Sequence, residues 1–108
     1  MSTAFEVLAE PHRRRILDLL RTADRPVNVL VDDLEVSQPA VSKHLRVLRR
    51  AGLVEARIDA QRRIYRLRPR ALREIDEWIE PYRVLWRESL DRLELHLGEM
   101  EKDETPSR

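Results

Sequence analysis

The sequence predicts a mainly α-helical domain that carries one small β-hairpin. Two patterns support this fold class. Along most of the 108 residues, apolar side chains recur at spacings of three and four, which is typical of amphipathic helices. Between residues 53 and 68 the pattern changes to β-branched and aromatic residues in partial alternation, which indicates strands. The expected order of elements is therefore α-α-α-α-β-β-α-α.

Three helices are expected before residue 37. A short first helix around residues 5–8 is interrupted at Glu10-Pro11, because proline suits the first turn of the next helix. The second helix then ends near Thr22, and the third covers residues 27–34. Residues 24–26 form a connector, and residues 35–36 form a tight turn into the fourth helix.

The fourth helix has a start signal, a stop signal and two different faces. Ser37 can cap its N-terminus, Pro39 suits its first turn, and Gly52 suits the left-handed position that ends a helix. At about 100° per residue, its apolar residues and His44 gather on one side. The other side carries four cations and no acid, and consists of Gln38, Pro39, Ser42, Lys43, Arg46, Arg49 and Arg50.

A hairpin and two further helices are expected after Gly52. Strands over residues 53–58 and 63–68 flank a tip at residues 59–62, and Pro69 ends the hairpin. Helices should follow from Arg70 to about Trp78 and from Pro81 to about Met100, with a break or kink at Pro81. A helix, a short turn, a helix and then a basic hairpin make a winged helix-turn-helix. We expect residues 1–100 to form this DNA-binding and dimerisation domain and residues 101–108 to form a flexible polar tail.

Charge is distributed unevenly along the chain. The net charge is +1, but residues 37–70 contain ten basic and two acidic residues, whereas the segments before and after them are net acidic. A basic segment attracts phosphate backbones, and acidic flanks discourage non-specific association.

Several function classes are not expected. The chain has no cysteine, so disulfides and thiolate metal sites are excluded. It has no apolar run of 18 residues and no signal-like N-terminus, so we expect a soluble, cytoplasmic protein without a membrane partner. We expect no enzyme and no cofactor, because no nucleophile–base arrangement, paired-carboxylate signature or glycine-rich phosphate loop stands out.

Four segments resemble the ArsR-type bacterial transcriptional regulators. They are residues 8–17 (LAEPHRRRIL), 37–45 (SQPAVSKHL), 48–54 (LRRAGLV) and 62–67 (RRIYRL), and the resemblance covers roughly residues 4–100. The resemblance implies a homodimer that binds an operator and blocks transcription.

The sequence departs from the metal-sensing branch of that family. That branch places Glu-Leu-Cys-Val-Cys-Asp-Leu where residues 28–34 stand here, and both cysteine positions are lost, to Leu30 and Asp32. The family's metal pattern in the C-terminal helix needs a second histidine, but none follows Glu94-x-His96. We therefore expect no metal site of these kinds. Ala60 also replaces the glycine that is common at the wing tip, which leaves the turn type open.

The basic face of the fourth helix and the wing are the expected DNA-binding surface. A merely solvated charged face is the alternative, but the absence of acids, the helix caps and the basic hairpin favour DNA. Ordinary solvent charge is the alternative for the wing arginines Arg57, Arg62, Arg63 and Arg66. A DNA contact is preferred for Arg62 and Arg63, whereas Arg66 is expected to face solvent. The predicted DNA-binding residues are Ser37, Gln38, Pro39, Ser42, Lys43, Arg46, Arg49, Arg50, Arg62 and Arg63.

The histidines and aromatic residues have plain structural explanations. We expect His44 to be half-buried and satisfied, and His12 and His96 to lie at the surface. Trp78, Tyr82 and Trp86 repeat every four residues. Packing is favoured for them, and an aromatic-lined effector pocket is the alternative.

An apolar seam on the last helix is the expected dimer interface. It consists of Trp86, Leu90, Leu93, Leu97 and Met100, at spacings of four, three, four and three. We expect it to pack against Phe5 and Leu8 of the first helix and against its symmetry mate. The leading function is thus a homodimeric repressor of an inverted-repeat operator, and a winged-helix module that binds protein is the alternative. The sequence identifies no effector.

Overall fold

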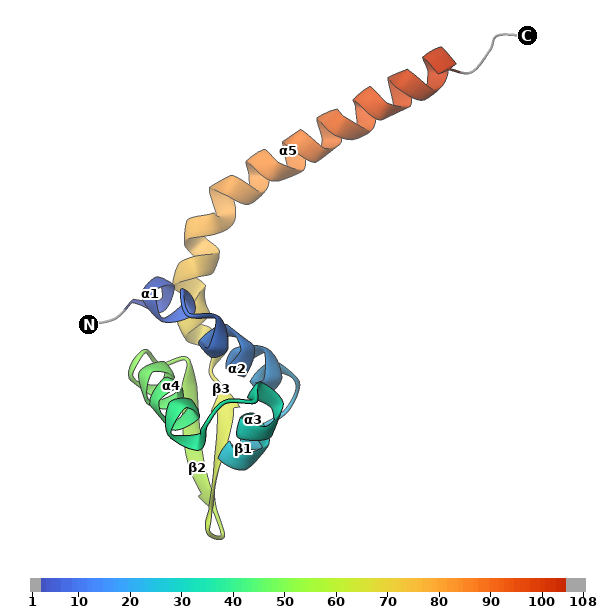
Figure 1. The fold of residues 1–108 in the computed structure, drawn as a ribbon. Helices are drawn as coiled ribbons and strands as arrows, with labels where there is room; N and C mark the ends of the chain where they lie inside the picture. Colours follow the sequence, from blue (N-terminus) through green and yellow to red (C-terminus); the bar gives the residue numbers. More distant parts are fainter. Residues whose placement is uncertain (1–2, 105–108) are drawn as a thin grey trace. The chain divides into compact units, whose positions relative to one another are not determined.

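A computed structural model describes residues 3–104, and it is mainly helical with a small antiparallel sheet (Figure 1). Contacts divide the chain into two compact units, one ending at Ile75 and one beginning at Asp76. The predicted winged helix-turn-helix is confirmed. Its elements are α1 (Ala4–Leu8), α2 (Pro11–Thr22), β1 (Arg25–Pro26), α3 (Val27–Leu34), α4 (Gln38–Arg50), β2 (Val54–Asp59), β3 (Arg62–Leu67), a 3-10 turn η1 (Pro69–Leu72) and α5 (Arg73–Glu104).

Side chains fix the junction between α1 and α2. The Glu10 carboxylate accepts the backbone N–H of Arg13 at 3.1 Å and caps α2, in which Pro11 is the first residue. The Arg13 side chain donates to the carbonyl of Val7 at 2.6 Å, and Arg14 donates to the carbonyl of Leu8 at 2.8 Å. The carbonyls at the end of α1 are thus satisfied by arginines of α2.

A left-handed residue follows each of the two helices of the helix-turn-helix, α3 and α4. Glu35 ends α3 with φ 56° and ψ 34°, and its N–H donates to the carbonyl of Val31. The Ser37 hydroxyl then accepts the N–H of Ala40 at 3.3 Å and caps α4. Gly52 lies just beyond α4 with φ 76°, so the predicted start and stop of this helix are both confirmed.

The wing is part of a three-stranded sheet in the order β1-β3-β2. The sequence predicts a connector at residues 24–26, and the strand within it was missed: Arg25 pairs with Tyr65 and Pro26 pairs with Ile64. Proline is tolerated in this strand because β1 is an edge strand. The predicted four-residue tip is also too long. Asp59 pairs with Arg62, which leaves a two-residue loop in which Ala60 has φ 58°.

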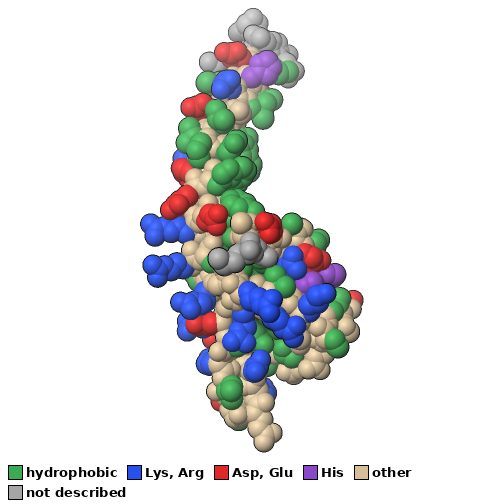
Figure 2. Space-filling model, turned by 90° about the vertical axis from the view of Figure 1, so that its left-hand side faces the viewer, with side chains coloured by type: hydrophobic (Ala, Val, Ile, Leu, Met, Phe, Trp, Pro, Cys, Tyr) green, Lys and Arg blue, Asp and Glu red, His purple; other side chains and the backbone are tan. Residues whose placement is uncertain are grey.

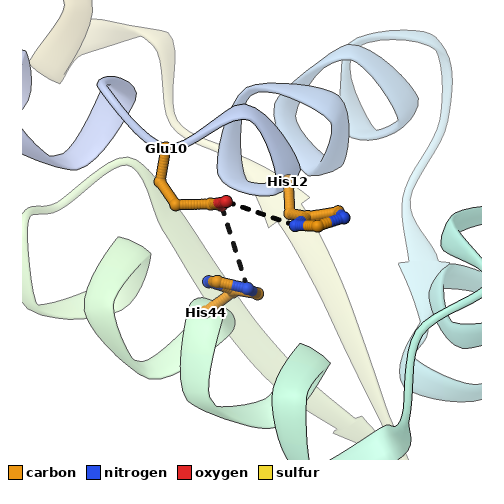
Figure 3. A group of neighbouring side chains, drawn as sticks. All are labelled: Glu10, His12 and His44. Atoms are coloured by element: carbon orange, nitrogen blue, oxygen red, sulfur yellow. Dashed lines mark hydrogen bonds and ion pairs between the residues drawn. The ribbon is translucent and has the colours of Figure 1, made fainter.

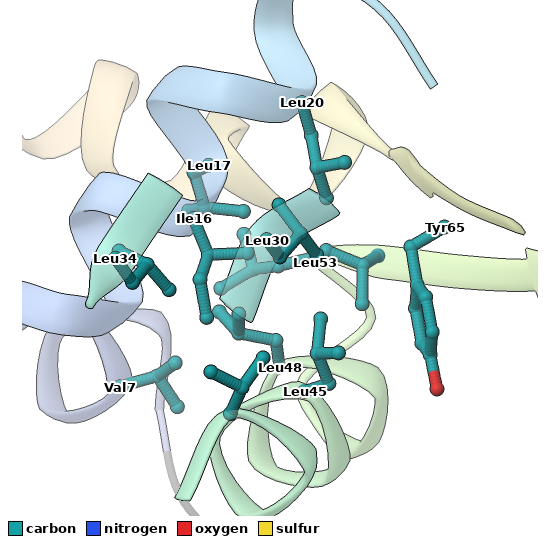
Figure 4. Packing of buried hydrophobic residues seen from close by; sticks show 12 residues of the cluster. Val7, Ile16, Leu17, Leu20, Leu30, Leu34, Leu45, Leu48, Leu53 and Tyr65 are labelled. Atoms are coloured by element: carbon teal, nitrogen blue, oxygen red, sulfur yellow. The ribbon is translucent and has the colours of Figure 1, made fainter. Parts of the chain in front are cut away.

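One apolar core lies between α2, α3, α4 and the sheet (Figure 4). Helix α4 contributes three side chains at spacings of four and three, which is why its other face can remain polar. The buried residues of this core are Val7, Ile16, Leu17, Leu20, Leu30, Leu34, Val41, Leu45, Leu48, Leu53, Val54 and Tyr65.

Of the break or kink expected at Pro81, the break into two helices is wrong. Helix α5 runs from Arg73 to Glu104 with Pro81 inside it, and the 3-10 turn η1 precedes it. Proline removes one hydrogen bond and introduces a local clash, at a cost of about 3 kcal/mol in a helix interior. The many turns on both sides keep the remaining hydrogen bonds. The helix also includes residues 101–104, which we assigned to the tail, and residues 105–108 lie outside the described part. Within residues 3–104, no helix is long and apolar enough to cross a membrane.

Candidate nucleic-acid interface

Helix α4 separates its two faces as the sequence predicts. Val41, Leu45 and Leu48 are almost fully buried in the core. Gln38, Pro39, Lys43, Arg46, Arg49 and Arg50 are exposed, and Ser42 is partly exposed. The core therefore holds α4 through one side and presents the other side to solvent.

A groove lies between this polar side of α4, the start of α3 and the wing. The polar side of α4 and the wing arginines meet here, although they are far apart in the sequence. Its lining consists of Pro26, Val27, Asn28, Gln38, Ser42, Arg46, Arg49, Gln61, Arg62, Arg63 and Tyr65. Six of the predicted DNA-binding residues are in this set, namely Gln38, Ser42, Arg46, Arg49, Arg62 and Arg63.

The groove cations differ from the other wing cations in their ion pairing. Arg66 lies 3.6 Å from a carboxylate oxygen of Glu55, and Arg57 lies 3.6 Å from one of Asp24. Arg68 lies 3.4 Å from the other oxygen of Glu55. Within residues 3–101, whose side chains are described, no carboxylate pairs with the four groove arginines, Arg46, Arg49, Arg62 and Arg63. Their charge is thus available to an anion.

A surface view shows where basic side chains gather on this part of the molecule. Figure 2 looks at the side on which α4 lies in Figure 1, and Lys and Arg side chains gather over the lower part of this face with few acidic side chains among them. A positive, concave surface of this kind concentrates phosphate-bearing ligands near it.

The other predicted residues have different positions. The Ser37 hydroxyl is used as the helix cap, and Pro39, Lys43 and Arg50 are exposed on α4 but do not line the groove. Sequence reasoning missed two polar groove residues, Asn28 and Gln61. The only signal for Gln61 was its place at the wing tip, and no local pattern connects Asn28 with α4.

Two of the histidines share one partner, a contact that the sequence did not predict. His44 on α4 and His12 on α2 both approach the carboxylate of Glu10, with His44 Nε2 at 3.8 Å and His12 Nδ1 at 3.2 Å. The expected half-burial of His44 is confirmed, since 18% of its side chain is exposed. The expectation that its polar atoms are hydrogen-bonded is not confirmed, because within the described residues its Nδ1 is buried without a hydrogen-bond partner.

The surroundings shift the pKa values of two groups in this cluster. Burial lowers the pKa of His44, and the positive charge of Arg13 lowers it further, while the charge of Glu10 opposes the shift. Burial raises the pKa of Glu10, but the N–H of Arg13 and the two histidines outweigh it, so this pKa is lowered overall. At neutral pH the carboxylate is charged and His44 is neutral.

Helix α5 carries the predicted seam on its surface. Leu90, Leu93, Leu97 and Met100 are each about half exposed, and Trp86 is 66% exposed. The rings of Trp78 and Tyr82 lie against each other with centroids 5.0 Å apart, so part of the aromatic repeat packs within its own helix.

The comparisons with known proteins identify the family. Residues 10–56 match the model described as the bacterial regulatory protein, arsR family. The HTH-type transcriptional regulator Rv2034 of Mycobacterium tuberculosis is 45% identical over 69 residues, which is 64% of this chain and 64% of that protein. The chain belongs to the ArsR family.

Solved structures of ArsR-type proteins share this architecture. A possible transcriptional regulator for arsenical resistance is 40% identical, with a TM-score of 0.69 over 89% of this chain and 97% of that one. The homodimeric winged helix-turn-helix DNA-binding domain Mb0332 of Mycobacterium bovis, a possible ArsR-family regulator, is 30% identical. Its TM-score is 0.57 over 81% of this chain and 78% of that fragment.

Proposed function

We propose that this ArsR-family chain is a sequence-specific DNA-binding transcriptional regulator that acts as a homodimeric repressor. The observation that carries the proposal is the groove between α4 and the wing, which is lined by four arginines that no described carboxylate pairs. Unpaired cations in a groove attract the phosphates of a duplex, whereas cations on an ordinary solvated surface are commonly paired or isolated.

Helix α4 is the recognition element in this proposal. Gln38, Ser42 and Arg46 follow one another at spacings of four on its exposed side and all line the groove. Gln offers a bidentate contact to adenine, Arg offers one to guanine, and Ser can contact either. Lys43 and Arg50, which lie outside the groove, would bind flanking phosphates.

The wing supplies the second contact. Arg62 and Arg63 stand at the start of β3, next to the two-residue loop, and Gln61 of that loop lines the same groove. Arginine at such a tip suits the DNA backbone or a narrow minor groove, where the negative potential is strongest. Arg57 and Arg66 are assigned no DNA contact, because each has a carboxylate partner.

The dimer would form through the seam of α5. Its apolar residues are uncovered in the single chain, and Figure 2 shows hydrophobic side chains along this helix. An isologous pair would bury both copies of the seam, together with Phe5 and Leu8 of α1, and relate two α4 helices by a two-fold axis. The operator should then be an inverted repeat with half-site centres about 10–10.5 bp apart or a multiple of that distance. Membership of the ArsR family is the basis of the repressor assignment. A dimer on an operator that overlaps a promoter would block access of polymerase.

Two substitutions test this function. The operator is first recovered by selection from a random duplex library, and binding is measured by gel shift. Arg46→Ala should weaken binding by about 1–3 kcal/mol and relax the preference for one base pair. Lys43→Ala should weaken binding to all sequences and reduce the salt slope by about one unit per contact.

The matched control is Arg57→Ala, because this arginine is in the same unit but is paired with Asp24. The control should bind as the unchanged protein does. If the Arg46 and Lys43 variants bind DNA with wild-type affinity, α4 is not part of the DNA interface. A duplex affinity independent of salt would instead favour a module that binds protein.

A further inference from the structure

One cluster of side chains is not used by the proposed DNA contacts. Glu10, His12 and His44 come from the start of α2 and from the core-facing side of α4, and they point toward one another (Figure 3). One ligand atom from each lies within 4.8 Å of the other two. Glu10 is their common partner through its two oxygens: Oε1 lies 3.2 Å from His12 Nδ1, and Oε2 lies 3.8 Å from His44 Nε2.

The donor set is one that zinc-type ions use. Two imidazole nitrogens and one carboxylate oxygen, with water in the fourth position, form the ligand set of many open zinc sites. With metal–ligand bonds of about 2.0–2.1 Å, tetrahedral ligand atoms lie about 3.3 Å apart. His12 Nδ1 and Glu10 Oε1 already have this separation. The three ligand atoms all lie within 4.8 Å of one another, so side-chain rotations of His44 and Glu10 would close the set around an ion.

The protonation states also suit a cation. A bound metal needs neutral imidazole and ionised carboxylate. Burial lowers the pKa of His44, and its neighbours keep the pKa of Glu10 low, so both ligands have the required form at neutral pH. The positive charges of Arg13 and Lys43 act against a cation here. The Arg13 side chain is held by the carbonyl of Val7.

The cluster also has a purely structural explanation. Glu10 caps α2 through Arg13 N–H, and it could simply pair with whichever histidine is protonated. That explanation accounts for the cap and the short contact to His12. It does not require His44 to face the same carboxylate from a different helix.

We propose that Glu10, His12 and His44 bind one divalent transition-metal ion of the zinc type per chain. The site lies within the winged-helix unit and uses neither the positions that lost cysteine, Leu30 and Asp32, nor His96 of α5. By connecting the start of α2 to α4, the bound ion would stabilise the unit that presents the recognition helix.

The test uses the full chain freed of metal by a chelator. Zn²⁺ is titrated by calorimetry and by competition with a chromophoric chelator, and Co²⁺ is added as a spectroscopic probe. One equivalent of Zn²⁺ should bind per chain, the melting temperature should rise, and Co²⁺ should give the intense visible bands of a four-coordinate site. His12→Ala should lower the affinity at least tenfold. Its exposed side chain contacts Glu10 and the His44 ring, so its loss should leave the fold intact.

His96→Ala is the matched control, because it removes the remaining histidine of the chain. It should bind Zn²⁺ as the unchanged protein does. His44→Gln should abolish binding, and its far-ultraviolet circular dichroism shows whether the helices are retained. The proposal is overturned if the unchanged protein binds no Zn²⁺ at micromolar concentration. It is equally overturned if His12→Ala binds as tightly as the unchanged chain, or if His96→Ala is the variant that loses binding.

Discussion

Arg62 gives the sharpest test of the wing, because a matched arginine lies four residues away on the same strand. Arg62 lines the groove and has no carboxylate partner among the described residues, whereas Arg66 is 3.6 Å from Glu55. If both wings touch DNA, Arg62→Ala removes one phosphate contact from each protomer. Arg66→Ala removes none.

The magnitude follows from the cations that the proposal places on the DNA backbone, which are Lys43, Arg50, Arg62 and Arg63. Four such contacts in each of two protomers give eight, and counterion release then predicts a slope of log K against log salt of about −7. Affinity should fall by roughly 10⁴-fold between 50 and 200 mM salt. Without Arg62 the slope becomes about −5, and the same salt interval should cost roughly 10³-fold.

Fluorescence anisotropy with a labelled 30-bp duplex measures both slopes. The operator is not needed, because phosphate contacts also supply non-specific binding. Arg66→Ala should keep the slope of the unchanged protein. An unchanged salt slope for Arg62→Ala, or an equal decrease of the slope in both variants, would contradict the assignment of Arg62 to the DNA contact.

Three further results are expected. Leu93→Glu places a charge on the half-exposed seam of each protomer, so it should raise the dimer dissociation constant, measured by sedimentation, at least about 30-fold. A wild-type monomer that binds a single half-site with full affinity would contradict the dimer model. Ala60→Gly should stabilise the fold by about 1 kcal/mol, because Ala60 holds φ 58° where glycine is not strained; thermal melts should show no such gain for Gln61→Gly. Stoichiometric arsenite should leave operator binding unchanged in a gel shift, because the chain offers no thiolate.

Local signals predicted the helix-turn-helix well. Ser37 and Gly52 delimit α4 through a side-chain cap and a left-handed backbone, and both effects depend only on neighbouring residues. The apolar period of α4 likewise determined which side is buried. The predicted break at Pro81 did not occur, because a local rule about one residue gave no weight to the turns of helix on either side.

The sequence by itself determined the fold class and the basic side of α4, because periodicity, caps and charge are properties of neighbouring residues. The family followed from the resemblance of short motifs. Only the tertiary structure decided which cations are free. Arg62 and Arg66 are chemically identical and four residues apart. Strand β2 brings Glu55 to Arg66, whereas Arg62 lines the groove together with residues of α4. The pairing of Arg25 with Tyr65 and the meeting of His12 with His44 have the same origin. Each depends on residues distant in sequence, and packing of the core sets their separation.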